Sequence, residues 1–192
     1  MQATVVSLFY SAADGSGDVQ PDRIEVALDG IVGDAHRSQQ RAAWEGDDKQ
    51  PEGTERRNER QWSATSVEEL EQISSDMGLA ETLSASDIRC NLCLSGIDQL
   101  SRLPKGTILK FPSGAELAVE EYNPPCLWMG TEIAKSHQTV NGEAPMNTAF
   151  SKAAKLSRGI VGVVEVAGAI CVGDVVEVSL YETPAWLIRS AD

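Results

Sequence analysis

Short stretches of alternating apolar and polar residues recur along the chain and predict strands with one buried face. Between Arg23 and Leu28, for example, Ile24, Val26 and Leu28 fall on the same side of the expected strand. Further strands are expected from short runs rich in β-branched residues that end at Gly, Pro or Ser, and these runs cover residues 3–10, 88–94, 107–111, 116–122, 160–166 and 175–180. Short strands separated by turn residues are typical of barrels and sandwiches, so we predict a mostly β fold.

Two segments have the apolar spacing of helices instead. Ser66 followed by Glu69 forms a capping box, and Gly78 ends the periodic run behind it. The apolar residues of that run are Val67, Leu70, Ile73 and Met77. A second helix is predicted from Asn147 to about Leu156, before Gly159. The expected fold is therefore a β-barrel or sandwich with a few peripheral helices.

A long polar segment runs from Gly33 to about Arg60 without a clear period, and such a segment is typical of a functional or disordered loop. It contains a group of arginines: Arg37, Arg41, Arg56, Arg57 and Arg60. They could pair on a solvated loop with its carboxylates, which are Glu45, Asp47, Asp48, Glu52, Glu55 and Glu59. They could also form an anion cradle, since guanidinium groups bind phosphate in a bidentate geometry.

Composition narrows the classes of function. The chain has 192 residues, which is enough for one domain over residues 1–192 with a sizeable core. A net charge of −13 would repel a phosphate backbone, so we expect no nucleic-acid partner. Residues 1–13 have no basic leading region, and no stretch is long enough to span a bilayer, so no membrane partner is expected. A cytoplasmic location follows as the default expectation.

The chain has four cysteines, too few for a disulfide scaffold of this size, so free thiols are expected. Cys90 and Cys93 have C-x-x-C spacing, but a strand here would place Cys90 on an apolar face with Leu92 and Leu94, and Cys93 on the opposite face. No second C-x-x-C completes a zinc site, and only two histidines are present. We therefore interpret Cys90 and Cys93 as packed thiols and Cys171 as a small core residue.

Cys126 differs from the other cysteines because Pro124 and Pro125 fix the backbone in front of it. A thiol presented by such a turn could be a nucleophile, because the thiolate is the reactive form in sulfur transfer. His36, Arg89 and the arginines of residues 56–60 are the candidates to stabilise a thiolate. The alternative is a buried cysteine after a turn, the common fate of free cysteines.

Gly33, Asp34 and His36 form a second candidate group. Gly33 would supply a permissive backbone, and Asp34 could cap the turn or orient His36. His36 itself could be a metal ligand, a proton shuttle or an ordinary loop histidine. The residues alone leave these alternatives open.

Taken in order, these elements resemble the MOSC domain family, named for the C-terminal domain of molybdenum cofactor sulfurase and also found as stand-alone proteins. The resemblance extends from about residue 20 to 180, nearly the whole chain. It rests on the stretch Gly33, Asp34, His36; on Arg60 and Gln61; on Arg89 and Asn91 before Gly96 and Ile97; on Pro125 and Cys126; on Arg158 and Gly159; and on a hairpin over residues 168–178 that contains Gly173 and Asp174.

The resemblance implies a mostly β, barrel-like fold of the MOSC and pyruvate-kinase-barrel kind. It also implies a molybdenum cofactor (molybdopterin), bound stably or transiently, and makes Cys126 the residue that carries a persulfide sulfur or ligates molybdenum. The implied cofactor-binding residues are Asp34, His36, Arg60, Arg89, Asn91 and Arg158. Fused members carry a pyridoxal-phosphate desulfurase domain; this chain has none, so any pyridoxal phosphate would belong to a sulfur-donating partner.

Two other functions remain open at this point. The chain could be a non-catalytic β-barrel module that binds a partner enzyme or a small anion. It could also be a component of a molybdenum-dependent reductase of N-hydroxylated compounds, a reaction to which stand-alone family members are linked. The partner, substrate and oligomeric state do not follow from the sequence.

Overall fold

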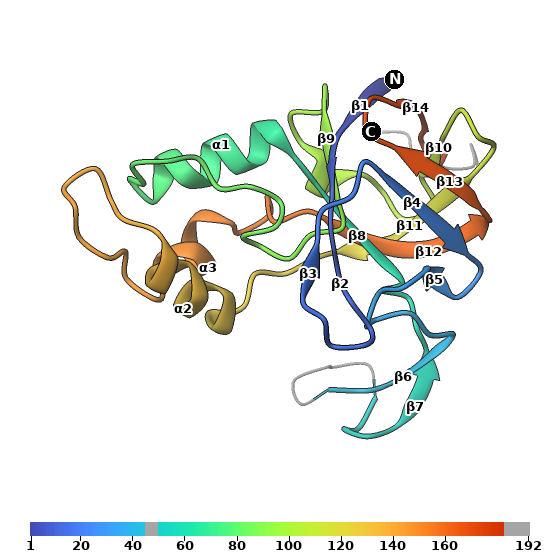
Figure 1. The fold of residues 1–192 in the computed structure, drawn as a ribbon, viewed down its shortest axis with the longest axis horizontal. Coiled ribbons are helices and arrows are strands. Elements are labelled where there is room, and N and C mark those ends of the chain that lie inside the picture. Colours follow the sequence, from blue (N-terminus) through green and yellow to red (C-terminus); the bar gives the residue numbers. More distant parts are fainter. Residues whose placement is uncertain (45–49, 183–192) are drawn as a thin grey trace, which may run out of the picture.

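A closed β-barrel forms the centre of the computed structural model, which describes residues 1–44 and 50–182 (Figure 1). Around the barrel the strands follow the order β1-β14-β10-β11-β12-β8-β9, and β9 pairs again with β1. Their bounds are β1 Gln2–Leu8, β8 Trp62–Ser66, β9 Leu92–Ser95, β10 Ile108–Lys110, β11 Glu116–Tyr122, β12 Ile160–Val166 and β14 Val175–Ser179. The prediction of a mostly β, barrel-like fold is confirmed.

Three smaller sheets and four helical segments surround the barrel. The sheets pair β2 (Tyr10–Ser11) with β3 (Asp18–Val19), β4 (Arg23–Ala27) with β5 (Gly30–Ile31) and β13 (Gly168–Cys171), and β6 (Gln40–Ala42) with β7 (Glu55–Arg57). The helices are α1 Val67–Asp76, α2 Leu127–Ser136, α3 Ala149–Ala153 and the 3-10 helix η1 Leu100–Arg102. In Figure 1, α1, α2 and α3 lie together on one side of the barrel, and the β6–β7 ribbon projects below it.

The apolar residues form two separate cores. One fills the barrel, where residues such as Leu92, Leu94 and Trp62 are fully buried. The other lies under the helices and joins Ile73, Met129 and Phe150. β8 and β9 pair in parallel, because the connection between them contains α1 and returns the chain to the same end of the barrel. This pair lies between the two cores.

The predicted capping box of α1 is half formed. The Ser66 hydroxyl accepts a hydrogen bond from the backbone N–H of Glu69 at 3.2 Å, and Gly78 follows the helix with φ 64°. The Glu69 carboxylate turns away from the cap and accepts from the N–H and hydroxyl of Ser101 in η1, at 2.8 and 3.0 Å. The Ser101 hydroxyl in turn accepts from Gly159 N–H at 2.6 Å. Glu69 therefore connects α1 to η1 and to the start of β12.

Gly159 is required where β12 starts beside β8. Its φ is +119°, and a Cβ there would lie 2.1 Å from the carbonyl oxygen of Ala64. A side chain at this position would push the strands apart and displace Arg158, the residue before it.

Several strand predictions match the structure, but the segment from Ile88 to Leu94 does not. The strand begins only at Leu92, because Arg89 has a left-handed φ of 52° and Cys90 N–H closes a turn on the carbonyl of Ala85. The predicted alternation therefore holds from Leu92 to Leu94 but is wrong for Cys90. Cys90 and Cys93 both pack in the helical core, whereas Leu92 and Leu94 face the barrel interior.

Three other predictions also need correction. Residues 168–178 do not form a hairpin: a turn joins β13 and β14, but β13 pairs with β4 and β14 pairs with β1 and β10. As a result Cys171 lies in an outer sheet and is partly exposed rather than a core residue. The helix expected over residues 147–156 spans only Ala149–Ala153, and α2 was not predicted. The predicted counter-charges Glu45, Asp47 and Asp48 and the tail from Thr183 lie outside the described residues.

Glu69 yields a stability prediction, because burial raises its pKa from 4.5 to about 7. A folded-state pKa above the unfolded one means that protonated Glu69 favours folding; this contribution is complete below pH 4.5 and is lost as the pH rises through about 7. The shift corresponds to roughly 3 kcal/mol. Glu69→Gln cannot ionise, so urea unfolding from pH 4.5 to 8 should show a flatter pH dependence than the wild type.

Glu71→Gln is the matched control, since Glu71 lies on the exposed side of the same helix. This variant should keep the wild-type pH dependence. A Glu69→Gln protein whose free energy of unfolding follows the wild-type curve would show that Glu69 is not the titrating group.

Candidate functional site

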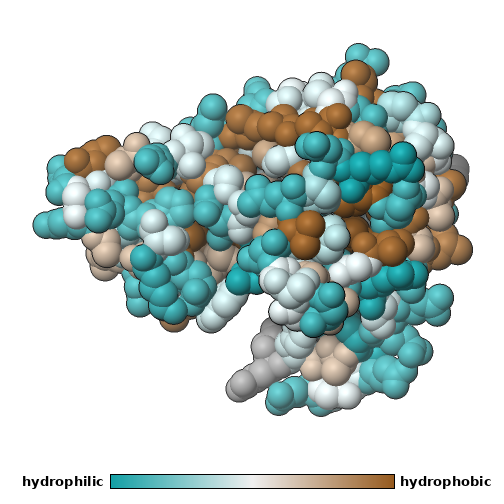
Figure 2. Space-filling model, viewed as in Figure 1, coloured by the Kyte–Doolittle hydropathy of each residue, from teal (hydrophilic) through white to brown (hydrophobic). Residues whose placement is uncertain are grey.

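A cavity of about 460 Å³ opens at one end of the barrel. Its walls come from the loop after β5, from β8, from the turn before β9 and from the start of α2. Figure 2 shows the surface hollowed between the β6–β7 ribbon and the part of the molecule that carries α2 and α3. All seven residues predicted for the site line this cavity: Asp34, His36, Arg60, Arg89, Asn91, Cys126 and Arg158.

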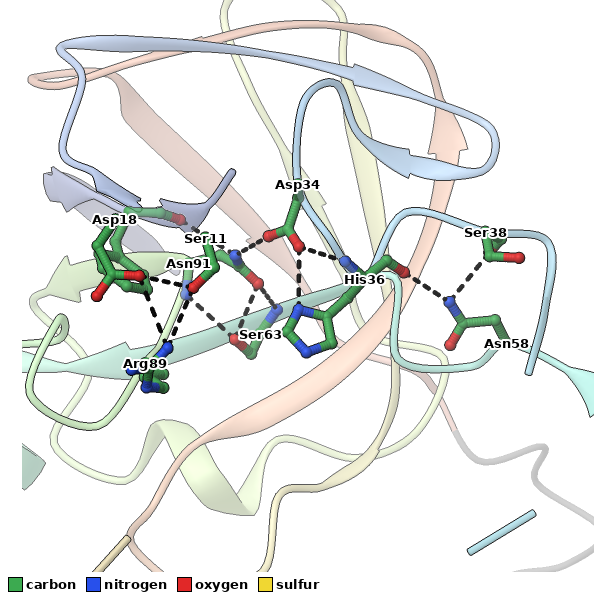
Figure 3. A network of polar contacts seen from close by, with 10 residues as sticks. Ser11, Asp18, Asp34, His36, Ser38, Asn58, Ser63, Arg89 and Asn91 are labelled. Carbon is green, nitrogen blue, oxygen red and sulfur yellow. Dashed lines mark hydrogen bonds and ion pairs between the residues drawn. The ribbon is translucent and has the colours of Figure 1, made fainter. Parts of the chain in front are cut away.

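Asn91 holds three segments of the cavity wall together (Figure 3). Its side-chain amide donates to the carbonyl of Phe9 at 3.1 Å and to the carboxylate of Asp34 at 2.9 Å. Its side-chain oxygen accepts from the N–H and hydroxyl of Ser63, at 2.9 and 3.0 Å. Its backbone N–H and carbonyl are also bonded, to Ser63 and Phe9. The amide orientation is thus fully determined by its partners.

Asp34, which Asn91 holds in place, in turn fixes the orientation of His36. The Asp34 side chain is buried, and its second oxygen accepts from the backbone N–H of His36 at 2.6 Å and contacts the ring Nδ1 at 3.0 Å. A carboxylate beside Nδ1 fixes the proton on that nitrogen, so Nε2 is left free for a ligand. Asp34 therefore both caps the turn and orients the ring, two roles that the sequence left as alternatives.

The same contact affects the charge of His36. The hydrogen bond to Asp34 raises the His36 pKa above its ordinary value, against the opposing effects of burial and of the Arg89 and Arg60 charges. The His36 side chain is 75% exposed, so its protonated form is accessible to an anion in the cavity. His36 is thus a cation of the cavity below its raised pKa.

The Arg60 side chain is largely buried, with 19% of its surface exposed. Its guanidinium donates to the side-chain oxygen of Asn123 and approaches Glu121 at 3.5 Å, and its backbone N–H donates to the side chain of Asn58. Burial lowers the Arg60 pKa from its ordinary value of 12.5, but a guanidinium remains charged at neutral pH. A fixed charge in a poorly solvated position attracts anions strongly.

Arg158 and Arg89 flank the Asn91 segment. One Arg158 nitrogen donates to the carbonyl of Ile88 at 3.3 Å, while its Nε is buried and has no hydrogen-bond partner. Arg89 donates to the Ser11 hydroxyl at 3.3 Å and lies 3.6 Å from the Asp18 carboxylate. Arg89 is held at the rim of the cavity, whereas Arg158 has an unused donor that a ligand could accept from.

Cys126 is exposed and forms the N-cap of α2. Pro124 and Pro125 hold it in extended backbone, with φ −115° and ψ 156°, and no side-chain hydrogen bond is made to the cap. Pro124 and Pro125 predict the turn that presents the thiol, but not the helix that follows it. The N-terminus of a helix favours a negatively charged group near it, and the Cys126 side chain lies at that end of α2.

The other arginines of the polar segment do not all lie at the cavity, so the anion cradle and the ion-paired loop each describe some of them. Arg41 lines the cavity together with Arg60. Arg37 pairs with Asp29 at 2.8 Å, and Arg57 pairs with Glu120, outside the cavity lining. The anion-cradle hypothesis therefore applies to only part of this group.

Cys90 and Cys93 lie behind the cavity rather than in it. Burial raises the pKa of Cys90 to about 11 and that of Cys93 to about 12, so both stay protonated and unreactive at neutral pH.

Within residues 1–44 and 50–182, no three side chains of His, Cys, Asp or Glu are grouped so that they could hold a metal ion. In the same residues, no helix has the length and apolarity to cross a bilayer.

The cavity also contains residues that were not predicted from the sequence, among them Trp44, Asn58, Asn123 and Trp128. Asn58 donates to the carbonyls of His36 and Ser38 and so fixes the loop after β5. Asn123 is buried behind Arg60. The sequence Asn123, Pro124, Pro125 was a usable signal for Asn123, since asparagine before proline favours a turn.

Known proteins share the fold of this chain. The chain is 33% identical over 182 residues to YuaD of Bacillus subtilis, which covers 95% of this chain and 93% of that protein. The name of YuaD gives it a proposed role in metal-sulfur cluster biosynthesis. The crystal structure of YuaD matches with a TM-score of 0.86 and 32% identity, over 95% of this chain and 98% of that one.

More distant structures share the fold alone. YiiM from Geobacillus stearothermophilus matches with a TM-score of 0.59 at 14% identity, over 94% of this chain and 75% of that one. YiiM from Escherichia coli matches with a TM-score of 0.58 at 13% identity, over 96% and 72%. The MOSC domain matches residues 46–177, a range that includes Arg60, Arg89, Asn91, Cys126 and Arg158 but begins after Asp34 and His36. The chain belongs to the MOSC domain family.

Proposed function

We propose that this chain carries sulfur on Cys126 and works with the molybdenum cofactor bound in the cavity that Cys126 borders. One observation carries the proposal: the exposed thiol of Cys126 and the side chains of His36, Arg60, Arg89 and Arg158 line the same cavity. The relationship to YuaD, named for metal-sulfur chemistry, points the same way.

The residues present fit an anionic cofactor. Molybdopterin carries a phosphate group, and guanidinium groups are the side chains best suited to bind phosphate. The buried, unpaired Nε of Arg158 is a donor that a phosphate oxygen could satisfy, and Arg60 is held in place by Asn123. Protonated His36 would add a third donor through Nε2. When bound, the cofactor would supply a molybdenum centre that accepts or donates sulfur, and Cys126 is the side chain suited to ligate it.

Loading of Cys126 needs a donor persulfide. The Cys126 thiolate would attack the outer sulfur of a persulfide on a partner protein, such as a desulfurase. The S–S bond of the donor breaks, a new S–S bond forms on Cys126, and the donor thiolate leaves, so no external oxidant or reductant is needed. The open position of Cys126 at the N-terminus of α2 allows this approach and favours the anionic forms before and after transfer.

The donor would be a separate protein. Pyridoxal-phosphate chemistry, where it supplies the sulfur, is assigned to that partner, and we propose that both proteins act in the cytoplasm.

Cys126→Ser should abolish persulfide formation without changing the fold, because serine retains the size of the side chain but is not a sulfur acceptor. Wild-type protein treated with a low-molecular-weight persulfide should gain one sulfur at Cys126, read by mass spectrometry after trapping with an alkylating agent. Thermal unfolding should give similar midpoints for the two proteins.

Cys171→Ser is the matched control, because Cys171 is partly exposed but lies in an outer sheet away from the cavity. This variant should label as the wild type does. Equal labelling of Cys126→Ser and wild type, or alkylation of Cys126 no faster than that of Cys171, would instead support a non-catalytic binding module.

Anion binding should weaken as the pH rises. His36 has a raised pKa and is a cation below it, so sulfate, whose charge is constant between pH 5 and 9, should bind progressively less tightly through that range. His36→Gln should remove most of this slope while the contribution of the arginines persists. Isothermal titration calorimetry at several pH values measures both effects.

His137→Gln provides the comparison, because His137 lies outside the cavity near Asp87. Its pH dependence should equal that of the wild type. If His36→Gln bound sulfate with an unchanged pH profile, His36 would not take part in anion binding.

A further inference from the structure

Two tryptophans flank the cavity and remain open to solvent. Trp44 follows β6 and Trp128 lies in the first turn of α2, so they come from different walls of the cavity. Each is 54% exposed, although both line the cavity. Large aromatic rings left open beside a pocket are typical of ligand-binding surfaces, because the ligand supplies the missing apolar contact.

Guanidinium groups hold both rings in place. The Arg41 guanidinium lies 4.3 Å from the centre of the Trp44 ring, and that of Arg60 lies 5.3 Å from it. The Arg89 guanidinium lies 5.5 Å from the centre of the Trp128 ring. Cation–π contacts of this kind orient an indole that would otherwise rotate freely.

The arginines are themselves fixed by other contacts. Arg41 pairs with the buried Glu59 at 2.6 Å, and Arg89 is held by Ser11 and Asp18. The rings are therefore ordered before a ligand arrives, which lowers the entropic cost of binding.

The cavity offers both charged and aromatic side chains to a ligand. Arg60 and Arg158 offer donors for an anionic group, while Trp44 and Trp128 offer aromatic faces. A small inorganic anion would contact the arginines but gain nothing from the aromatic faces. Flat nitrogen heterocycles stack on indole and guanidinium planes, and a cavity of about 460 Å³ lies in the size range of sites for such molecules.

We propose that Trp44 and Trp128 form a stacking site for a flat nitrogen heterocycle whose phosphate group is bound by Arg60 and Arg158. This inference rests on the proposed function and extends it, because it assigns the ring and the phosphate of the ligand to different side chains. A phosphorylated pterin and a purine nucleotide share this chemistry.

The test compares probes with and without a ring. Neopterin monophosphate, guanosine monophosphate and inorganic phosphate are titrated into the full chain by calorimetry, and quenching of tryptophan emission is recorded in parallel. At least one ring-bearing probe should bind roughly tenfold more tightly than inorganic phosphate, the factor expected from one stacking contact. Whichever of neopterin monophosphate and guanosine monophosphate binds more tightly identifies the class of ring.

Substitutions then separate the two parts of the site. Trp128→Leu and Trp44→Leu should each lose most of the added affinity for the ring-bearing probes, whereas Trp128→Phe should retain much of it. Leu127→Ala is the matched control: Leu127 is 57% exposed and adjacent to Trp128, but it does not line the cavity. It should bind all probes as the wild type does.

The outcomes distinguish this inference from the proposed function. If inorganic phosphate binds but neither ring-bearing probe binds more tightly, or if both leucine variants match the wild type, the stacking site is wrong and the anion site stands. If none of the three probes binds, the proposed cofactor site is wrong as well.

Discussion

The candidate site depends on the hydrogen bonds of one asparagine. Asn91 uses both side-chain N–H groups and its side-chain oxygen to join Phe9, Asp34 and Ser63, which come from segments far apart in the sequence. Buried polar groups without partners are costly, so each of these contacts must form for the others to be maintained. The orientation of His36 follows from this network, because Asp34 can bind the ring only where Asn91 holds its carboxylate.

The backbone around Asn91 couples the site to both cores. Arg89 has a left-handed φ of 52°, and the chain enters β9 at Leu92 directly after Asn91. The turn places Arg89 in the cavity wall, Cys90 in the helical core and Leu92 in the barrel core. Because three side chains within four consecutive residues lie in three environments, a change in packing of either core would move the cavity wall. The rigid barrel therefore holds the side chains that line the cavity in fixed positions.

The sequence predicted the barrel and the seven lining residues better than it predicted how they are supported. Strands such as β11 and β12 could be predicted because their β-branched runs end at clear turn residues, and α1 could be predicted from its cap at Ser66. The strand before Leu92 could not, since one left-handed residue resets the alternation on which the prediction relied. Trp44 and Trp128 gave no signal because isolated aromatic residues have no periodic partners, and the Arg60 and Arg89 guanidinium groups that lie near the rings come from other segments of the chain.

The distribution of charge limits what can occupy the cavity. The chain carries a net charge of −13, yet the cavity brings together Arg60, Arg89, Arg158 and His36, and its buried carboxylate, Asp34, is already bonded to Asn91 and His36. An extended polyanion would be repelled by the net negative charge of the chain, whereas a small anion can enter the cavity and contact its cations. The placement of the cations in one cavity, and not the total charge of the chain alone, therefore determines which anions can bind there.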